Sequence, residues 1–501
     1  ITLSFPVLQG QGQHRNQTGV SEITFTGKEE TIWIEKREVQ LPVMMGQGIK
    51  EEPWADAFDL REDSIGPTKK LSPSTTKPGC AYSSRVTSGM TQVIVGDKAL
   101  YEKGMSYYIK KAYEDAAVTF QKLIRDYPES EWIASSYYWM GETRHHQGRD
   151  SEAFPYYYKV AEKFPKSEFY AYALYSCGWI RLRQGVYGEG HQFFHQVYER
   201  ASAHPIAESS LFWSGYSLYQ LGRYGEALQE LETLLQKYPK GKWRPEAEYL
   251  IGVSTFRLRR FQEAADRFKD FWRRHPKHPL EESSRYSLAW SLVSLGQYAE
   301  GRKAFEDILL TYPGTKLSDP IFWGIIKTYL GAGEAEKAIF LYQKYISQYL
   351  SSPWVEQILF DIGQYYFGKK EYAHAASIFR EFLKTYRESD LREWVHFMLG
   401  ESLFNLKDYS GAITSYHQVL EEKGRAALES QVFSKLGYTY FYLKNYEMAI
   451  QYWEKLLSAF PDLPEKNEVL YWMAEALLLK QDYKKGVGYV ERLRGDPTLY
   501  P

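Results

Sequence analysis

A period of 37 residues organises the chain from about residue 95 onward. Stepping by 37 residues through Ala227 reaches eleven positions, and all of them are Ala or Gly. They are Ala116, Ala153, Gly190, Ala227, Ala264, Gly301, Ala338, Ala375, Ala412, Ala449 and Gly486. Three residues earlier, nine of the eleven positions are aromatic, and twelve residues earlier ten hold another small residue. A fixed period of this length indicates a repeat architecture, in which each unit packs on its neighbours.

Each unit is predicted to hold two helices, as in "SSLFWSGYSLYQLGRYGEALQELETLLQKYP", residues 209–239. Helix A contains Gly215, and we expect Gly222 to end it in a left-handed cap. Helix B carries Ala227 near its start, and it ends at an aromatic–proline step that proline cannot extend. Small residues at the Gly215 and Ala227 positions let the two helix backbones approach closely, while the flanking aromatic side chains fill the space between successive hairpins.

One unit departs from this spacing. Gly324 lies fourteen residues before Ala338 instead of twelve. We therefore predict that the turn between the helices of the seventh hairpin is two residues longer, and the preceding link two residues shorter, than elsewhere.

The repeat resembles the tetratricopeptide repeat (TPR): aromatic, small and aromatic residues in helix A, then Ala, an aromatic or Leu, and Pro in helix B. The resemblance implies an all-α, right-handed superhelical solenoid of eleven hairpins over residues 95–501. The longer period and phrases such as "YYWMGETRHHQGRDSEAFPYYYKVAEKFPKSEF" are most similar to bacterial cell-envelope members. These include the TolA-binding periplasmic coordinator and BamD-like outer-membrane assembly proteins.

The N-terminal region lacks the period. Residues 1–42 include "ITFTGKEETIWIEKREVQL", whose alternation of apolar and polar residues predicts a β-hairpin arm. Residues 43–94 are rich in Pro, Ser, Thr and Gly, which is typical of an extended linker. The arm could pack along the solenoid or pair with a partner's sheet edge, and a flexible leader is the alternative.

Composition and motifs argue against several classes of function. The net charge of −1 disfavours a general nucleic-acid binder, and the chain has no run of 18 apolar residues that would predict a transmembrane helix. The glycines follow the repeat and match no phosphate-binding motif, so we expect no catalytic residues, no cofactor and no metal. His191 and His195 have the i, i+4 spacing of metal ligands but lack a third ligand nearby in the sequence, so we interpret them as surface histidines. We interpret His145, His146, His275 and His278, near helix ends, as solvated groups.

Aromatic residues make up 17 % of the chain and provide the main candidate binding site. The TPR resemblance implies that the A helices line a concave face, where rings spaced i, i+4 and i+7 would form a groove for an extended or helical partner segment. The alternative is that the same rings pack within the solenoid. The predicted groove residues are Tyr138, Tyr175, Trp179, Phe212, Tyr216, Tyr219, Tyr249, Phe256, Tyr286 and Trp290.

A second candidate is a basic patch within residues 257–279, "RLRRFQEAADRFKDFWRRHPKHP". It would dock an acidic partner, although an ordinary solvated helix face has the same composition. The patch residues are Arg257, Arg259, Arg260, Arg273 and Arg274.

These features predict a non-catalytic scaffold that assembles other proteins, in the periplasm or at the outer membrane of a bacterial envelope. The alternative is a regulatory or substrate-recruiting subunit of an enzyme complex whose catalytic part is another chain. A cytosolic chaperone adaptor is disfavoured, because the residue after the helix-A glycine is never the Asn of the family's carboxylate clamp.

Overall fold

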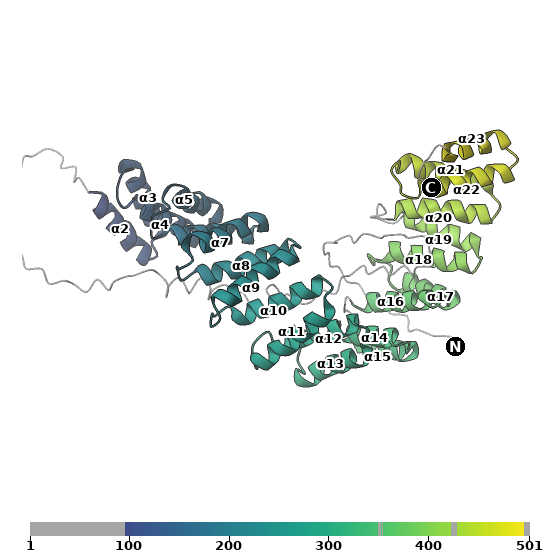
Figure 1. Ribbon diagram of the computed structural model, residues 1–501, viewed down its shortest axis with the longest axis horizontal. Coiled ribbons are helices and arrows are strands. Elements are labelled where there is room, and N and C mark those ends of the chain that lie inside the picture. The colour runs from purple at the N-terminus through teal and green to yellow at the C-terminus, as the bar shows by residue number, and fades with distance from the viewer. Residues whose placement is uncertain (1–95, 349–351, 353, 422–427, 495–501) are drawn as a thin grey trace, which may run out of the picture. The chain divides into compact units, whose positions relative to one another are not determined.

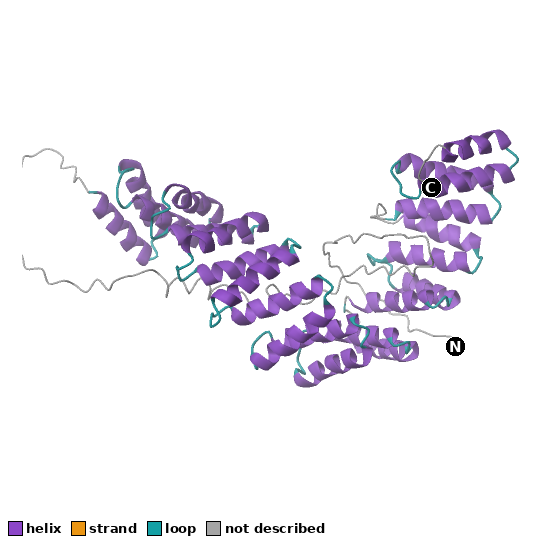
Figure 2. Ribbon diagram, in the orientation of Figure 1, coloured by secondary structure: helices purple, strands orange, loops and turns teal. Residues whose placement is uncertain are grey.

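The computed structural model describes residues 96–348, 352, 354–421 and 428–494, and every regular element in them is a helix (Figures 1 and 2). The 22 described helices, α2 to α23, follow one another in A–B order at the 37-residue period, as the sequence predicts. Ten of the eleven A–B pairs pack as hairpins within one compact unit, and the remaining pair, α12 and α13, is divided between the two units. The arm at 1–42 and the linker at 43–94 lie outside the described residues.

The chain divides into two compact units at the step from Leu295 to Gly296. The described helices of the unit before this point are α2 (Asp97–Ile109), α3 (Tyr113–Asp126), α4 (Ile133–His146), α5 (Asp150–Lys163), α6 (Tyr170–Arg183), α7 (Tyr187–Ala201), α8 (Ala207–Gln220), α9 (Tyr224–Lys237), α10 (Arg244–Arg257), α11 (Phe261–Arg274) and α12 (Glu281–Ser294).

The described helices of the unit from Gly296 onward are α13 (Tyr298–Thr311), α14 (Ser318–Gly331), α15 (Ala335–Gln348), α16 (Trp354–Gly368), α17 (Tyr372–Thr385), α18 (Arg392–Asn405), α19 (Tyr409–Glu421), α20 (Glu429–Tyr442), α21 (Tyr446–Ala459), α22 (Lys466–Leu479) and α23 (Tyr483–Arg494). The even-numbered helices are the A helices of the hairpins and the odd-numbered ones are the B helices.

Most hairpins are held together where a small residue of helix A faces a large side chain sixteen residues later on helix B. In the third hairpin a Cβ at Gly178 would lie 2.7 Å from the ring of Phe194, which is far too close. The same pairing recurs in eight hairpins, seven of them with a ring on helix B, and it confirms the prediction that Gly215 is a helix-contact position. The eight pairs are Gly104–Phe120, Gly141–Tyr157, Gly178–Phe194, Gly215–Leu231, Gly252–Phe268, Gly363–Phe379, Gly400–Tyr416 and Gly437–Trp453.

The seventh hairpin keeps the same turn length as the others, so the predicted two-residue extension is wrong. Helix α14 ends at Gly331 and α15 begins at Ala335, the same three-residue interval that separates α8 from α9. Buried Ile326, not Gly324, occupies the register position of the other helix-A small residues. Gly324 instead faces Phe305 of the preceding helix α13. The sequence suggested a shifted turn because Gly324 is small, but its contact belongs to a different helix pair.

All eleven A helices are followed by a residue with positive φ, again 37 residues apart. Gly222 has φ of 74°; its N–H donates to the carbonyl of Tyr219 and the next N–H donates to that of Leu218, which is a Schellman cap. The left-handed cap predicted at Gly222 is therefore confirmed. Six hairpins place a residue other than glycine in this conformation: Lys111, Arg259, Lys370, Lys407, Lys444 and Gln481.

The turns between hairpins contain a hydrogen-bond acceptor that recurs at the same repeat position. In five of them a Ser or Thr hydroxyl accepts the backbone N–H of the residue two positions later, at or just before the start of the next helix A. The bonds are Trp132 N to Ser130 (3.1 Å), Phe169 N to Ser167 (3.2 Å), Leu317 N to Thr315 (2.9 Å), Trp354 N to Ser352 (3.3 Å) and Leu391 N to Ser389 (3.1 Å). These bonds fix the direction in which the chain enters each helix A.

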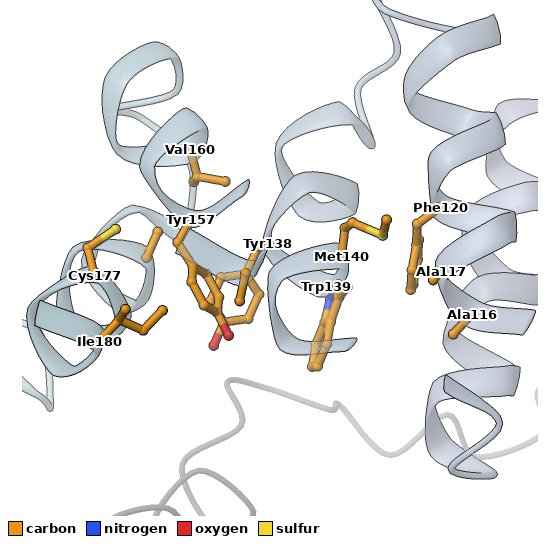
Figure 3. Close-up of a cluster of buried hydrophobic side chains, with 12 residues drawn as sticks. Ala116, Ala117, Phe120, Tyr138, Trp139, Met140, Tyr157, Val160, Cys177 and Ile180 are labelled. Atoms are coloured by element: carbon orange, nitrogen blue, oxygen red, sulfur yellow. The ribbon is translucent and has the colours of Figure 1, made fainter. Parts of the chain in front are cut away.

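The hydrophobic core of the first three hairpins is shared between neighbours. In the first three hairpins Phe120, Tyr138, Met140, Tyr157 and Cys177 belong to one buried cluster (Figure 3). These residues come from α3, α4, α5 and α6, so each hairpin completes the core of its neighbour. This nearest-neighbour arrangement is what a repeat protein requires for stability.

Candidate protein-binding surfaces

The ten aromatic residues of the predicted groove are all buried, with exposed fractions from 0 % to 8 %. Their rings meet residues of adjacent hairpins. Phe212 stacks on Trp243 with ring centroids 4.5 Å apart, and Trp179 meets Trp213 at an angle of 60° over the same distance. The rings therefore fill the space between hairpins, and their role in partner binding stays a prediction. These residues are Tyr138, Tyr175, Trp179, Phe212, Tyr216, Tyr219, Tyr249, Phe256, Tyr286 and Trp290.

Helix α8 illustrates why the A helices are so enclosed. Every residue from Ser210 to Tyr219 is buried, and α8 contacts both flanking B helices, α7 and α9, as well as the next A helix, α10. A helix that is surrounded in this way carries apolar residues around its whole circumference. Burial raises the pKa of Tyr216 to about 12, so its phenol stays neutral across the physiological range.

The structure divides the predicted basic patch into two groups. Arg257, Arg259 and Arg260 lie where α10 leads into α11, whereas Arg273 and Arg274 lie in the last turn of α11. Since a helix of this length extends over about 20 Å, the groups stand at opposite ends of it. Arg274 also forms ion pairs with Glu248 (3.2 Å) and Asp270 (3.0 Å). Docking of an acidic partner stays a prediction, and each group would act separately.

The histidine pair His191 and His195 is engaged in a polar cluster between α7 and the fourth hairpin. The Nδ1 atom of His191 lies 2.8 Å from the Ser214 hydroxyl, and that of His195 lies 2.7 Å from Oε1 of Glu230. The His191 side chain is half-buried and burial lowers its pKa, so it is less solvated than the sequence interpretation expects. In the part of the chain that the structure describes, no group of three His, Cys, Asp or Glu residues could hold a metal ion.

Other histidines near helix ends are likewise bonded rather than simply solvated. His275 Nε2 lies 2.8 Å from Oε2 of Glu248, and His145 Nδ1 lies 2.6 Å from Oδ1 of Asp150. Both rings are largely enclosed, with 17 % and 11 % of the side chain exposed. The sequence could not reveal this, because the carboxylate partner of His275 lies on the helix before its own.

Buried carboxylates are also paired with specific donors. The Tyr416 hydroxyl donates to Oε1 of Glu401 (2.5 Å), and Lys435 lies 2.7 Å from Oε2 of the same carboxylate. Asp361 receives the indole N–H of Trp323 (2.7 Å) and lies 3.7 Å from the ammonium of Lys327. A buried charge that is bonded in this way stabilises the arrangement of its neighbours, so these groups are accounted for by the packing of the A helices.

An aromatic cluster on the B helices was not foreseen from the sequence. Phe154 stacks on Tyr158 with centroids 5.9 Å apart, and Phe193 of α7 meets both rings edge-on. The Arg181 guanidinium lies 3.9 Å from the Phe154 ring centroid. Tyr158 is 44 % exposed. The repeat alignment contained a signal for this cluster. Phe154 and Tyr158 lie one period before His191 and His195, so all four rings occupy equivalent positions on helix B.

Three family models match five segments of the chain. Residues 205–300 and 326–419 match the YfiO family, described as an outer membrane lipoprotein. Residues 98–130, 135–167 and 430–463 match tetratricopeptide-repeat models. No curated protein sequence matches the chain significantly. The helical hairpins and these matches together show a helical solenoid that carries tetratricopeptide repeats at residues 98–130, 135–167 and 430–463.

Two solved structures are similar in part. A tetratricopeptide repeat protein from Parabacteroides merdae is 19 % identical, with a TM-score of 0.40, over 54 % of this chain and 98 % of its own. The PilF protein of Pseudomonas aeruginosa is 16 % identical, with a TM-score of 0.32, over 44 % of this chain and 93 % of its own. Among the described helices, none is long and apolar enough to cross a lipid bilayer.

Proposed function

We propose that the protein is a non-catalytic scaffold that holds other proteins together in a complex of the bacterial cell envelope, in the periplasm or at the outer membrane. The observation that carries this proposal is the match to the outer membrane lipoprotein family over residues 205–300 and 326–419. The repeat architecture supports the scaffold part of the proposal, because a solenoid presents an extended surface without a deep catalytic pocket.

The proposal is tested by crosslinking in intact cells that produce the protein, followed by separation of envelope and soluble fractions. We expect the protein in the envelope fraction, crosslinked to envelope proteins that mass spectrometry identifies. Recovery in the cytosol, joined to a soluble enzyme, would contradict the proposal and favour a regulatory or substrate-recruiting subunit instead.

Two variants then test whether the partner binds to the A helices or to the B helices. Replacing Tyr216 and Tyr219 with Phe removes the hydroxyls of two groove rings without opening a cavity. Tyr158→Lys instead changes the exposed ring of the B-helix cluster. If the A helices bind the partner, the first variant weakens crosslinking and the second does not. The opposite result would indicate that the partner binds to the B helices.

A further inference from the structure

Two of the turns between hairpins use histidine where others use serine or threonine. The backbone N–H of Ile206 donates to Nδ1 of His204 (3.3 Å), and that of Leu280 donates to Nδ1 of His278 (3.2 Å). The two histidines occupy the repeat position of Ser130, Ser167, Thr315, Ser352 and Ser389. The imidazole nitrogen therefore takes over the role of the hydroxyl oxygen.

The two acceptors differ in one chemical respect. A hydroxyl oxygen accepts a hydrogen bond at any physiological pH, whereas Nδ1 accepts only while it carries no proton. In His204 and His278 the bond to the backbone requires the neutral ring with its proton on Nε2. Protonation converts Nδ1 into a donor that faces another donor, so the bond is lost.

We propose that His204 and His278 make two joints of the solenoid sensitive to acid: the joint between α7 and α8 and the joint between α11 and α12. At neutral pH both joints are held like the serine joints. In acid both lose the bond that orients the following helix A, while the Ser and Thr joints keep theirs. The inference concerns regulation of the fold and does not depend on the proposed function.

The surroundings of His204 favour the neutral ring. Tyr172 of α6 packs edge-on against it, with ring centroids 4.6 Å apart. Burial lowers the pKa of His204. Burial and the nearby Glu168 raise the pKa of Tyr172, so the phenol stays uncharged and offers the imidazolium no counter-charge.

The surroundings of His278 contain opposing charges. The Nε2 atom lies 3.7 Å from Oε1 of Glu246 on α10, which would favour the imidazolium, while His275 in the same turn disfavours it. Burial, assisted by His275, lowers the pKa of His278. Burial also raises the pKa of Glu246, which weakens the counter-charge that its carboxylate offers to His278 in acid.

The sign of the effect follows from these directions. The folded pKa of both histidines is below the ordinary value of 6.5, so the unfolded chain binds protons more readily. Their contribution to the free energy of unfolding is complete above pH 6.5 and is lost as the pH falls through the folded pKa values.

The experiment compares the full chain with the double variant His204→Ser/His278→Ser, which restores the hydroxyl of the other joints. Urea unfolding midpoints are measured between pH 7.5 and pH 5. We expect the midpoint of the parent protein to fall over this range and that of the double variant to fall clearly less. His374→Ser is the matched control, because His374 is an exposed residue of α17, and this variant should follow the parent.

A measurement on the unaltered protein provides the second test. Hydrogen exchange of peptides that contain the Ile206 and Leu280 amides is compared between pH 7.5 and pH 5.5, after correction for intrinsic rates. Loss of one hydrogen bond at each joint should reduce protection by about fivefold. Peptides with the Trp132 and Phe169 amides should keep theirs. Equal changes at all four amides, or an unchanged pH dependence in the double variant, would overturn the proposal.

Discussion

At the residue scale, two glycines of the third hairpin differ in whether the structure has room for the methyl group of an alanine. A Cβ at Gly178 would lie 2.7 Å from Phe194, whose ring is completely buried, whereas a Cβ at Gly188 would meet nothing within 4 Å. Both residues lie in helices, α6 and α7. The same substitution to alanine should therefore have opposite effects at the two sites.

Gly178→Ala should lower the free energy of unfolding by about 1–3 kcal/mol, because the packed core must move to admit the methyl group. Gly188→Ala should raise it by up to about 1 kcal/mol through better helix propensity. Urea unfolding of the two variants beside the parent protein measures both. A stabilised Gly178→Ala variant would mean that α6 and α7 are not packed as closely as the structure has them.

The cap residues give a second prediction at this scale. Lys444 has φ of 63°, the left-handed conformation that costs a side chain about 1–2 kcal/mol. Lys444→Gly should relieve this strain and, after the loss of glycine's greater unfolded freedom, stabilise the protein by roughly 0.5–1 kcal/mol. Gly222→Ala at the equivalent cap should destabilise it. Equal midpoints for Lys444→Gly and the parent protein would contradict a strained cap.

The sequence predicted some of these residues and missed others for a physical reason. Gly215 and Gly222 were identified because glycine marks close contacts and left-handed turns by its chemistry. Lys444 and five other cap residues carry no such mark, and only the spacing of 37 residues reveals them. Gly324 was assigned to the wrong helix pair for the converse reason, since a small residue shows that something is close without showing what.

At the scale of the helical element, the serine of a joint connects two hairpins. Ser389 Oγ accepts the N–H of Leu391 (3.1 Å) and donates to the carboxylate of Glu356 at the start of α16. In the joint before α10, where the corresponding residue is Gly241, Oε1 of Glu208 accepts the N–H of Trp243 directly (2.7 Å). The structure thus satisfies the same N–H even where no side chain is present in the turn.

Ser389→Ala should therefore destabilise the protein by about 1 kcal/mol, since the buried N–H and the carboxylate both lose a partner. Ser389→Thr should be close to neutral, because Thr315 fills the same role in another joint. Thermal unfolding of both variants provides the measurement. Ser458→Ala is the control, as that exposed hydroxyl bonds only within its own helix. Identical losses for Ser389→Ala and Ser458→Ala would show that the joint does not need this bond.

The sequence predicted the elements better than their surfaces. Aromatic–proline steps and the small-residue period determine where helices begin and end through local rules. The rings of the A helices, however, have the same i, i+4, i+7 spacing whether they face a partner or a neighbouring hairpin. Whether such a ring is exposed depends on the residues that pack against its helix. Phe212, for example, is covered by Trp243 of the next hairpin. Local sequence does not carry that information.

At the scale of the whole molecule, a solenoid whose hairpins contact only their neighbours should respond locally to damage. Gly178→Ala lies in the unit before Gly296 and Gly400→Ala in the unit after it, and each would press a Cβ against a ring of its own hairpin. We expect Gly178→Ala to increase hydrogen exchange in the second to fourth hairpins and leave α18 to α21 unchanged. Gly400→Ala should do the reverse. Mass spectrometry of exchanged peptides from the full chain measures both variants together. Increased exchange throughout both units from either substitution would mean that the eleven hairpins unfold as one cooperative body, and that the loosening of a single joint would be felt along the entire chain.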